Sequence, residues 1–320
     1  MSVGGGGCGH IGKYTTRKKP DNISFEEIIS YENLLRAWED FIKGKRGRSD
    51  VNMLARTLSD SLWQLHFDLK SGTYAHGGYY EYTICDPKKR VIHKASVRDR
   101  VVHRLIYNAL YRSFDRRFIH DSYSSRKGKG THKARDRFKF FVQKVSKNHT
   151  KQCFVLKFDI QKCFASIDQK TLLVLLERNI VDDRLYLLAK NIIESFESGL
   201  PLGNLTSQLF INAYLHELDL FCKHELHIKY YLRYADDVIL VSDDKLELEV
   251  VYKRIANFLL SKLYLMTHKK SVATIYQGVD VLGVVFFPQY GILRKRTRVR
   301  MTMRAQYGKD FYTRNGAKES

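Results

Sequence analysis

The stretch Tyr230-Tyr-Leu-Arg-Tyr-Ala-Asp-Asp-Val-Ile-Leu-Val-Ser242 decides the fold class of this chain. It places two adjacent acids, Asp236 and Asp237, between two short apolar runs, which is the pattern of a β-hairpin with an acidic turn. Two neighbouring carboxylates at the tip of such a hairpin repel each other and lose hydration unless cations neutralise them. The bland alternative is ordinary turn chemistry, which we assign to Asp243 and Asp244 a few residues later.

A third acid ends another apolar run. The segment Cys-Phe-Val-Leu-Lys-Phe-Asp at 153–159 has the pattern of a buried strand that closes on Asp159. If the two strands are neighbours, Asp159, Asp236 and Asp237 converge at one end of a sheet. Magnesium binds a few carboxylates together with substrate phosphates and water, and two such ions about 3.5–4 Å apart stabilise the attacking and leaving oxygens of phosphoryl transfer. The three acids therefore predict a site for two magnesium ions.

The composition points to a polyanionic partner. Lys and Arg number 55 against 34 Asp and Glu, a formal net charge of +21, and such a surplus is typical of proteins that bind nucleic acid. There is no run of 18 apolar residues to span a membrane, no secretion signal at the N-terminus, and only five scattered cysteines, which indicate reduced thiols. We therefore expect a cytoplasmic protein that binds no membrane.

The remaining hydrophobic pattern divides the chain into two blocks. Helical spacing extends from Phe25 to about Leu69, a hairpin follows at 79–93, and a basic helix spans Val97 to Phe118. The second block begins near Gln152 and reads as strand, helix, helix, strand, strand, helix, strand, the last strand being the hydrophobic run from Val279 to Phe287. That order predicts a mixed sheet covered by helices.

Six motifs, in order within about residues 50–290, resemble those of reverse transcriptases. Tyr234-Ala-Asp-Asp237 resembles the family's Tyr-x-Asp-Asp motif, and Phe158-Asp-Ile-Gln-Lys-Cys-Phe164 resembles its first catalytic motif. The other four are Gly199-Leu-Pro-Leu-Gly-Asn-Leu-Thr-Ser-Gln208, the primer-grip-like Val281-Leu-Gly-Val-Val-Phe286, and two finger motifs of the bacterial and group II intron branch, Arg98-Asp-Arg-Val-Val-His103 and Ser122-Tyr-Ser-Ser-Arg126. All six in register leave little room for chance.

The resemblance implies an α+β right-hand polymerase fold with fingers, palm and a short thumb, the palm sheet being ferredoxin-like. It predicts a flexible basic N-terminus at 1–22, fingers at 23–150, a palm at 151–290 with a fingers insertion at about 169–200, and a short basic thumb or tail at 291–320. Template RNA, the cDNA product and dNTPs would be its ligands. Because so short a thumb is a poor grip on a duplex, we expect a basic accessory protein or a structured RNA as a partner.

The resemblance also assigns roles around the three acids. Ile160 joins Asp159, Asp236 and Asp237 as a metal ligand. Phe164 would lie under the sugar of the incoming nucleotide and exclude a 2′-hydroxyl, which makes the enzyme a DNA polymerase; without Asp159, it would read as a core residue at a strand end.

Cations are expected at the phosphates of the nucleotide. Arg90, with Lys88 or Lys89, resembles the fingertip cations that clamp the triphosphate, and a hairpin tip of this composition suits phosphate. It could equally be a solvated turn. Lys269 or Lys270 would protonate the departing pyrophosphate, although a basic loop is more often only solvated.

The middle motif departs from the common family pattern, in which Gln-Gly is followed by Ser-Pro. Here Leu202 precedes Gly203, and Gln208 follows Ser207. Both changes together resemble the reverse transcriptases of diversity-generating retroelements, which copy a template RNA with frequent errors at adenines. The resemblance implies that Leu202 and Gly203 contact the nucleotide and that Leu202 and Gln208 lower fidelity. Neutral drift at two positions is the alternative.

Three other functions compete with this interpretation. A retron-like or antiphage reverse transcriptase would share the chemistry but differ in primer and product. A noncatalytic nucleic-acid-binding protein on a polymerase scaffold is disfavoured because all three acids are present. An RNA-dependent RNA polymerase is disfavoured by Phe164 and by the Tyr-Ala-Asp-Asp motif.

Overall fold

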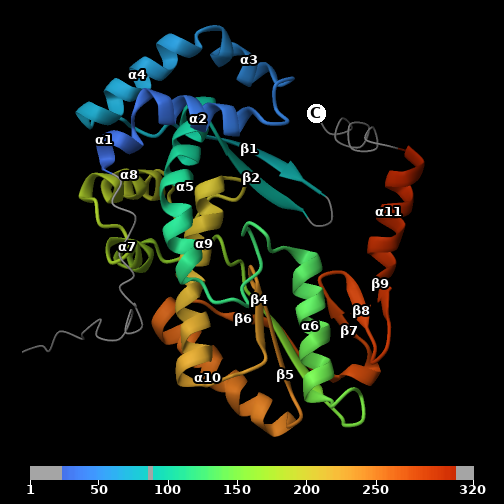
Figure 1. Ribbon diagram of the computed structural model, residues 1–320. Helices are drawn as coiled ribbons and strands as arrows, with labels where there is room; N and C mark the ends of the chain where they lie inside the picture. The colour runs from blue at the N-terminus through green and yellow to red at the C-terminus, as the bar shows by residue number, and fades with distance from the viewer. Residues whose placement is uncertain (1–23, 86–88, 308–320) are drawn as a thin grey trace, which may run out of the picture.

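The computed structural model describes residues 24–85 and 89–307 of the chain. The segment expected to be a flexible basic N-terminus, the turn at 86–88 with Lys88, and the end of the basic tail lie outside those ranges. Within them, a helical block carries a projecting two-stranded hairpin, and a four-stranded sheet with its own helices lies below (Figure 1).

The first block is mostly helical. Its elements are α1 (Phe25–Ile28), α2 (Tyr31–Ile42), α3 (Ser49–Arg56), α4 (Leu58–Ser71), β1 (Tyr79–Ile84), β2 (Arg90–Ala95), α5 (Val97–Arg117) and α6 (Thr131–Val145). Strands β1 and β2 pair antiparallel from Tyr79–Ala95 to Ile84–Arg90, and we call them the fingertip hairpin. The expected hairpin and the basic helix are therefore confirmed, whereas α6 was not predicted because basic residues interrupt its apolar stripe.

The second block holds the palm sheet, whose strand order is β4-β5-β3-β6. Its elements are β3 (Phe154–Ile160), α7 (Gln169–Glu177), α8 (Asp183–Glu194), α9 (Leu205–Leu220), a five-residue π-helical turn η1 (Phe221–Glu225), β4 (Tyr231–Tyr234), β5 (Asp237–Ser242), α10 (Lys245–Leu263) and β6 (Thr267–Thr274). In chain order the four strands are the first to the fourth of a βαββαβ unit, so the sheet has the ferredoxin-like arrangement that the resemblance implied.

Two details of the predicted sheet were wrong. All three strand pairs are antiparallel, so the sheet is not mixed. The fourth strand is β6, a segment that includes His268, Lys269 and Lys270 and lacks an apolar run. The run from Val279 to Phe287 instead forms β7 (Val279–Val281) and β8 (Val284–Phe286), which pair with β9 (Gly291–Leu293) in a separate sheet. An edge strand exposed to water needs no apolar pattern, which explains the error.

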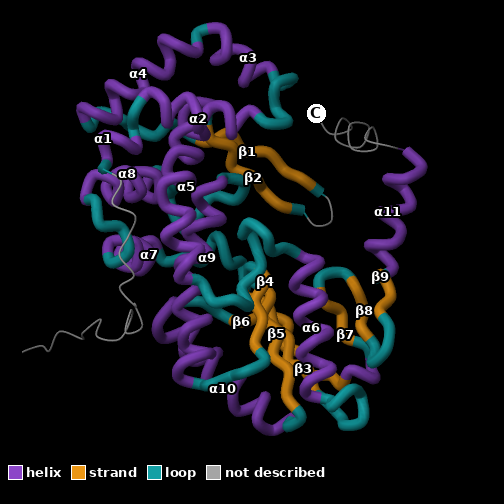
Figure 2. The backbone as a smooth tube through the Cα atoms, viewed as in Figure 1, coloured by secondary structure: helices purple, strands orange, loops and turns teal. Residues whose placement is uncertain are grey.

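Alternating side chains of β3 pack against two different cores. Leu156 and Phe158 face a core built with α9 and α10, whereas Val155 faces a second core with Phe138 of α6 and Phe286 of β8. Figure 2 shows the strands lying between these helices. The palm sheet is thus covered on both faces, and only its ends are available for a polar site.

Short polar residues fix where the helices begin. The Ser96 hydroxyl accepts a hydrogen bond from the Asp99 amide at 3.1 Å and starts α5. The Asp168 carboxylate accepts one from the Thr171 amide at 2.7 Å and starts α7, while Asp244 caps α10. Such caps satisfy amides that a helix leaves unpaired. A further helix, α11 (Lys295–Tyr307), follows β9, and none of the described helices is long and apolar enough to cross a membrane.

Candidate active site

The two adjacent acids lie at a tight turn between β4 and β5. Tyr234 pairs directly with Asp237, so Ala235 and Asp236 are the two turn residues. Ala235 adopts a φ of 53°, in the left-handed region that a residue with a side chain seldom enters. A two-residue turn of this kind matches the twist of the flanking strands, and it holds both carboxylates at the end of the palm sheet.

The third acid reaches the same end of the sheet. Phe158 of β3 lies opposite Val238 of β5, so Asp159 is the next residue along toward the turn. The Ile160 amide donates a hydrogen bond to the Asp236 carbonyl at 3.2 Å, which ties β3 to the turn itself. The expected convergence of the three carboxylates therefore follows from strand pairing.

The electrostatics of these acids are unfavourable in the protein alone. Burial raises the pKa of Asp236 above its usual range, and the charges of Asp237 and Asp159 raise it further. Burial also raises the pKa of Asp237, although Lys157, with its Nζ atom 3.7 Å from Asp237 Oδ1, offsets part of this effect. The Oδ1 atom of Asp159 is buried without any hydrogen-bond partner. Mutual repulsion and an orphaned carboxylate oxygen mark a place where cations are wanted.

A buried ion pair supports the acidic turn from behind. Arg233 is fully buried, its Nε and one terminal nitrogen each lie 2.7 Å from an oxygen of Asp219 on α9, and its other terminal nitrogen donates to the Ala235 carbonyl at 3.2 Å. Burial alone would raise the pKa of Asp219, but the charge and hydrogen bonds of Arg233 bring it down to about 2. The pair thus anchors the turn to α9.

The donor set fits magnesium completed by substrate. Within residues 24–85 and 89–307, no three His, Cys, Asp or Glu side chains form a group that could hold a metal ion unaided. Magnesium in polymerase sites takes one or two carboxylates and fills its octahedron with water and substrate phosphates. The orphaned Asp159 oxygen and the strained pair Asp236 and Asp237 are suited to that role. The Ile160 side chain is apolar, so only its main-chain carbonyl could contribute.

The fingertip hairpin brings positive charge to the acidic turn. Arg90 begins β2, and Lys89 precedes it; both side chains are exposed. Burial raises the pKa of Asp236, whereas the charge of Arg90 acts to lower it, which places Arg90 within electrostatic reach of that carboxylate. The charge of Arg90 therefore acts on the acidic turn.

The short loop of residues 199–203 contacts the first catalytic motif at one end and the fingertip hairpin at the other. Gly199 has a φ of 66°, and a Cβ added there would lie 2.5 Å from the Phe164 carbonyl oxygen. The Leu200 amide donates to that same carbonyl at 2.7 Å. At the other end of the loop, the Leu202 carbonyl accepts a hydrogen bond from the His93 amide of β2 at 2.9 Å. Phe164 itself is half-buried at the edge of the main core.

The remaining residues of the middle motif lie in two different places. Gly203, with a φ of 114°, packs so tightly on the hairpin that an added Cβ would lie 2.6 Å from the Ile92 side chain. Leu202 is half-buried, and Gln208 is exposed on the first turns of α9. Gly203 and Leu202 thus lie where the palm meets the hairpin, whereas Gln208 belongs to the helix that follows.

The predicted pyrophosphate cation is engaged elsewhere. Lys270 forms an ion pair with Glu249 of α10, and its ammonium lies 4.5 Å from the centre of the Tyr252 ring. Lys269, with a φ of 50°, is exposed beside it. The structure therefore does not bring Lys270 to the acids, and a role for it requires release from Glu249.

Sequence reasoning missed three residues that shape the site. Lys157 and Arg233 are cations inside apolar strands, and Asp219 is an acid on the apolar face of α9 next to Leu218. A charge in such a position must be paired, so the coincidence of an arginine in a buried strand and an acid on a buried helix face was an available signal. Lys157 also donates to the Asp280 carbonyl of β7 at 3.0 Å.

Parts of this chain are similar to known proteins. A curated relative, the uncharacterized 91 kDa protein in the cob intron of Schizosaccharomyces pombe, is 27% identical over 146 residues, which are 42% of this chain and 17% of that protein. Telomerase from Candida tropicalis, solved in complex with a TWJ fragment of telomeric RNA, superposes with a TM-score of 0.50 at 15% identity, covering 73% of this chain and 48% of that one. Telomerase from Candida albicans, in the same kind of complex, gives a TM-score of 0.49 at 13% identity, covering 73% and 51%.

The Candida tropicalis superposition agrees with a right-hand polymerase fold, and the chain spans about half of that telomerase and a sixth of the fungal intron protein. Residues 85–286 match the family described as reverse transcriptase (RNA-dependent DNA polymerase). The matched segment contains the palm sheet, the acidic turn and the loop 199–203. Because the match covers more than half of the sequence, the chain belongs to the reverse transcriptase family.

Proposed function

We propose that this chain is an RNA-directed DNA polymerase that makes cDNA by two-metal nucleotidyl transfer at Asp159, Asp236 and Asp237. The observation that carries the proposal is the convergence of three carboxylates: the pKa values of Asp236 and Asp237 are raised by burial and by acidic neighbours, and Asp159 has an unpartnered buried oxygen. Two Mg²⁺ ions, when bound, supply the charge that stabilises the attacking and leaving oxygens. The ligands would be the three carboxylates and the main chain of Ile160.

The chain's own residues then position the nucleotide. Arg90 and Lys89 reach the triphosphate from the fingertip hairpin, because both carry exposed cationic groups there and the charge of Arg90 acts on Asp236. Phe164 lies under the sugar, held by its main-chain bond to the loop 199–203. Lys270 serves the pyrophosphate only if substrate draws it away from Glu249.

Primer extension on an RNA template with dNTPs tests the assignment of the acids. Asp236→Asn keeps the shape of the turn but removes charge from the proposed metal site, and a loss of several kcal/mol of transition-state stabilisation lowers the rate by about a hundredfold or more. Asp243→Asn is the matched control, since Asp243 is an exposed acid directly after the other end of β5. Substantial extension by a folded Asp236→Asn protein would refute the site and would favour a noncatalytic or differently placed function.

Sugar selection supplies a test of Phe164. Replacement by Ala opens space beneath the ribose, so incorporation of ribonucleotides should rise relative to deoxynucleotides. The measurement is the ratio of the two kcat/KM values on one primer–template, which cancels any general loss of activity. An unchanged ratio in an active Phe164→Ala enzyme would mean that another residue excludes the 2′-hydroxyl.

We further propose that the enzyme is the error-prone reverse transcriptase of a diversity-generating retroelement. What supports this is Leu202, an apolar residue where relatives carry a glutamine, at the contact between palm and hairpin. A polar contact to the nucleotide contributes about 1.4 kcal/mol, so its absence weakens the preference for the correct base by about tenfold. A retron-like role shares every one of these contacts and differs in its primer and product.

The fidelity proposal is tested by sequencing cDNA from the native enzyme and from Leu202→Gln on one template. Errors opposite adenine should fall about tenfold in the variant, and Gln208→Pro, the second change toward the common pattern, is measured alone and in combination. Accurate copying by the native enzyme, or an adenine error rate that Leu202→Gln does not change, contradicts the proposal.

A further inference from the structure

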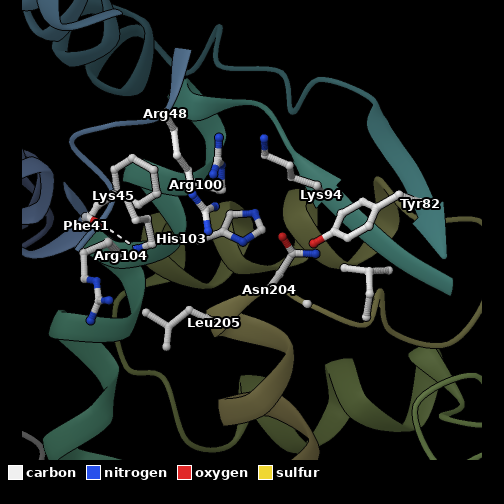
Figure 3. Close-up of a pocket in the computed structure, with 12 residues that line it drawn as sticks. Phe41, Lys45, Arg48, Tyr82, Lys94, Arg100, His103, Arg104, Asn204 and Leu205 are labelled. Atoms are coloured by element: carbon white, nitrogen blue, oxygen red, sulfur yellow. Dashed lines mark hydrogen bonds between the residues drawn. The ribbon is translucent and has the colours of Figure 1, made fainter. Parts of the chain in front are cut away.

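A polar cavity lies at the end of the loop 199–203, where Gly203 and Asn204 line it. Its volume is about 150 Å³, and it is bounded by α2, the segment before α3, the fingertip hairpin, α5 and the start of α9 (Figure 3). Five cationic side chains line it: Lys45, Arg48, Lys94, Arg100 and Arg104. None of the described residues that line it is acidic.

Only part of this positive charge is neutralised. Asp50, just outside the cavity, forms ion pairs with Lys94 and Arg100: its Oδ2 atom lies 2.7 Å from the Lys94 ammonium and 2.6 Å from an Arg100 guanidinium nitrogen. Burial lowers the pKa of Lys45, and the charges of Arg104, Arg48 and Arg100 lower it further. The Nε atom of Arg104 is buried without a hydrogen-bond partner. Unrelieved repulsion and an orphaned donor are what a site for an anion shows before the anion binds.

One acceptor is also left open in this cationic cavity. Asn204 is 3% exposed, and its Nδ2 atom donates to the His93 carbonyl at 2.9 Å. A carbonyl can only accept, so this bond fixes the orientation of the amide. The Asn204 Oδ1 atom is then the outward end, and it is buried without a partner. Figure 3 shows this carboxamide between His103 and the hydroxyl end of Tyr82.

The two orphaned groups together define the ligand. Cations take a phosphate, and a lone carbonyl oxygen takes a hydroxyl or amine hydrogen. Tyr82, 41% exposed at the rim, presents a ring on which a base can stack. The cavity is smaller than the pockets that enclose free small ligands, so it suits the phosphate and sugar of one unit in a strand that continues outside.

We infer that this cavity binds one ribonucleotide of the template RNA, with Lys45, Arg48 and Arg104 on its phosphate and Asn204 Oδ1 accepting from its 2′-hydroxyl. The 2′-hydroxyl is the group by which a protein distinguishes RNA from DNA. The inference rests on the proposed polymerase function and assigns to this cavity the choice of RNA as template. One loop then serves two strands, with Phe164 at its first end and Asn204 directly after its last residue.

The test measures binding without metal or dNTP, so that it does not depend on catalysis. The probe is a fluorescent DNA primer annealed to a template whose single-stranded overhang is either RNA or DNA of one sequence. The native chain should bind the RNA overhang about threefold to tenfold more tightly, the value of one net hydrogen bond. Asn204→Ala should lose that preference, with little change in affinity for the DNA overhang.

The phosphate-binding cations are tested by salt dependence. Lys45→Gln/Arg48→Gln should weaken binding to both overhangs and lower the slope of log affinity against log salt by about 0.7 for each single-strand phosphate that the variant no longer neutralises. Lys253→Gln/Arg254→Gln, which removes two exposed cations from α10, away from the fingertip hairpin, is the charge-matched control and should alter neither quantity (Figure 1). A double variant with an unchanged slope refutes the phosphate site.

A change in the RNA ligand tests the same contact even if Asn204→Ala fails to fold. Single 2′-deoxy positions are scanned through the RNA overhang with the native chain, and one position should reproduce the threefold to tenfold loss of affinity. Asn204→Ala should be insensitive to deoxy substitution at that position. If no position matters, or if native protein binds RNA and DNA overhangs equally while extension still requires Asp236, the cavity inference fails and the polymerase assignment stands. Extension that does not depend on Asp236 would instead remove the proposed function.

Discussion

The carboxylate of Asp219 on α9 and the carboxylates at the turn after β4 are neutralised differently. Asp219 receives two nitrogens of Arg233, and its pKa falls to about 2. Asp236, only three residues after Arg233, has a pKa raised by burial and by its acidic neighbours. The first group is complete within the chain and supports structure. The second requires external cations, which is the property that a catalytic metal site must have.

Breaking the internal pair should have the largest effect. Arg233→Met leaves Asp219 charged and buried without its partner, so the free energy of unfolding should fall by about 3–5 kcal/mol. The measurement is urea unfolding followed by circular dichroism. The double variant Arg233→Met/Asp219→Leu removes both charges and should recover much of the loss. Equal instability of the single and double variants would show that the hydrogen bonds to the turn, rather than the ion pair, carry the effect.

Supplying the external cation should have the next largest effect. At a free Mg²⁺ concentration about a hundredfold above its dissociation constant, one bound ion stabilises the native chain by about 2.7 kcal/mol. Asp236→Asn should gain far less, and in EDTA it should be no less stable than the native chain because it relieves repulsion with Asp159 and Asp237. Thermal melts in the presence of a dNTP, with and without Mg²⁺, provide both numbers. A variant stabilised as strongly as the native chain would place the metal elsewhere.

Acid should protonate Asp219 and break its ion pair with Arg233 within a defined pH range. The folded pKa of Asp219 is about 2, below its ordinary value of 3.8, so its contribution is complete above about pH 4 and is lost as pH falls through 2. The shift corresponds to about 2 kcal/mol of stability. Urea midpoints between pH 5 and 2.5 are compared for the native chain and Arg233→Met/Asp219→Leu. Parallel curves for the two proteins would contradict the lowered pKa.

The smallest effect is expected at Lys157, whose ammonium lies beside a carboxylate of the acidic turn. Its Nζ atom is 3.7 Å from Asp237 and also holds the Asp280 carbonyl. Lys157→Met removes a partly exposed ion pair worth less than about 1 kcal/mol. With one fewer competing cation, the Mg²⁺ concentration for half-maximal extension should fall about twofold to fivefold. A rise would mean that Lys157 orients Asp237 for the metal instead of competing with it.

The sequence was most informative where side-chain pattern and strand pairing coincide. An apolar hairpin around Asp236 and an apolar strand ending at Asp159 predicted the convergence of the acids, because β5 and β3 are the two central strands of the sheet and pair with each other. Strand β6 was missed since an edge strand carries His268 and Lys270 without penalty. The cavity at Asn204 could not be predicted, because its cations come from the segment between α2 and α3, from β2 and from α5, and only the tertiary fold unites them.

The hydrogen bonds at the two ends of the loop 199–203 have a mechanical consequence. Leu200 is fastened to the carbonyl of Phe164, and Leu202 is fastened to the amide of His93 on β2. Gly199 and Gly203 pack closely at the two ends of the loop, since a methyl group added to either would collide with the segment beside it. The loop therefore couples the position of the fingertip hairpin to that of Phe164. If the fingertip hairpin swings toward the acidic turn, it must either pull on the support of Phe164 or break the bond at His93.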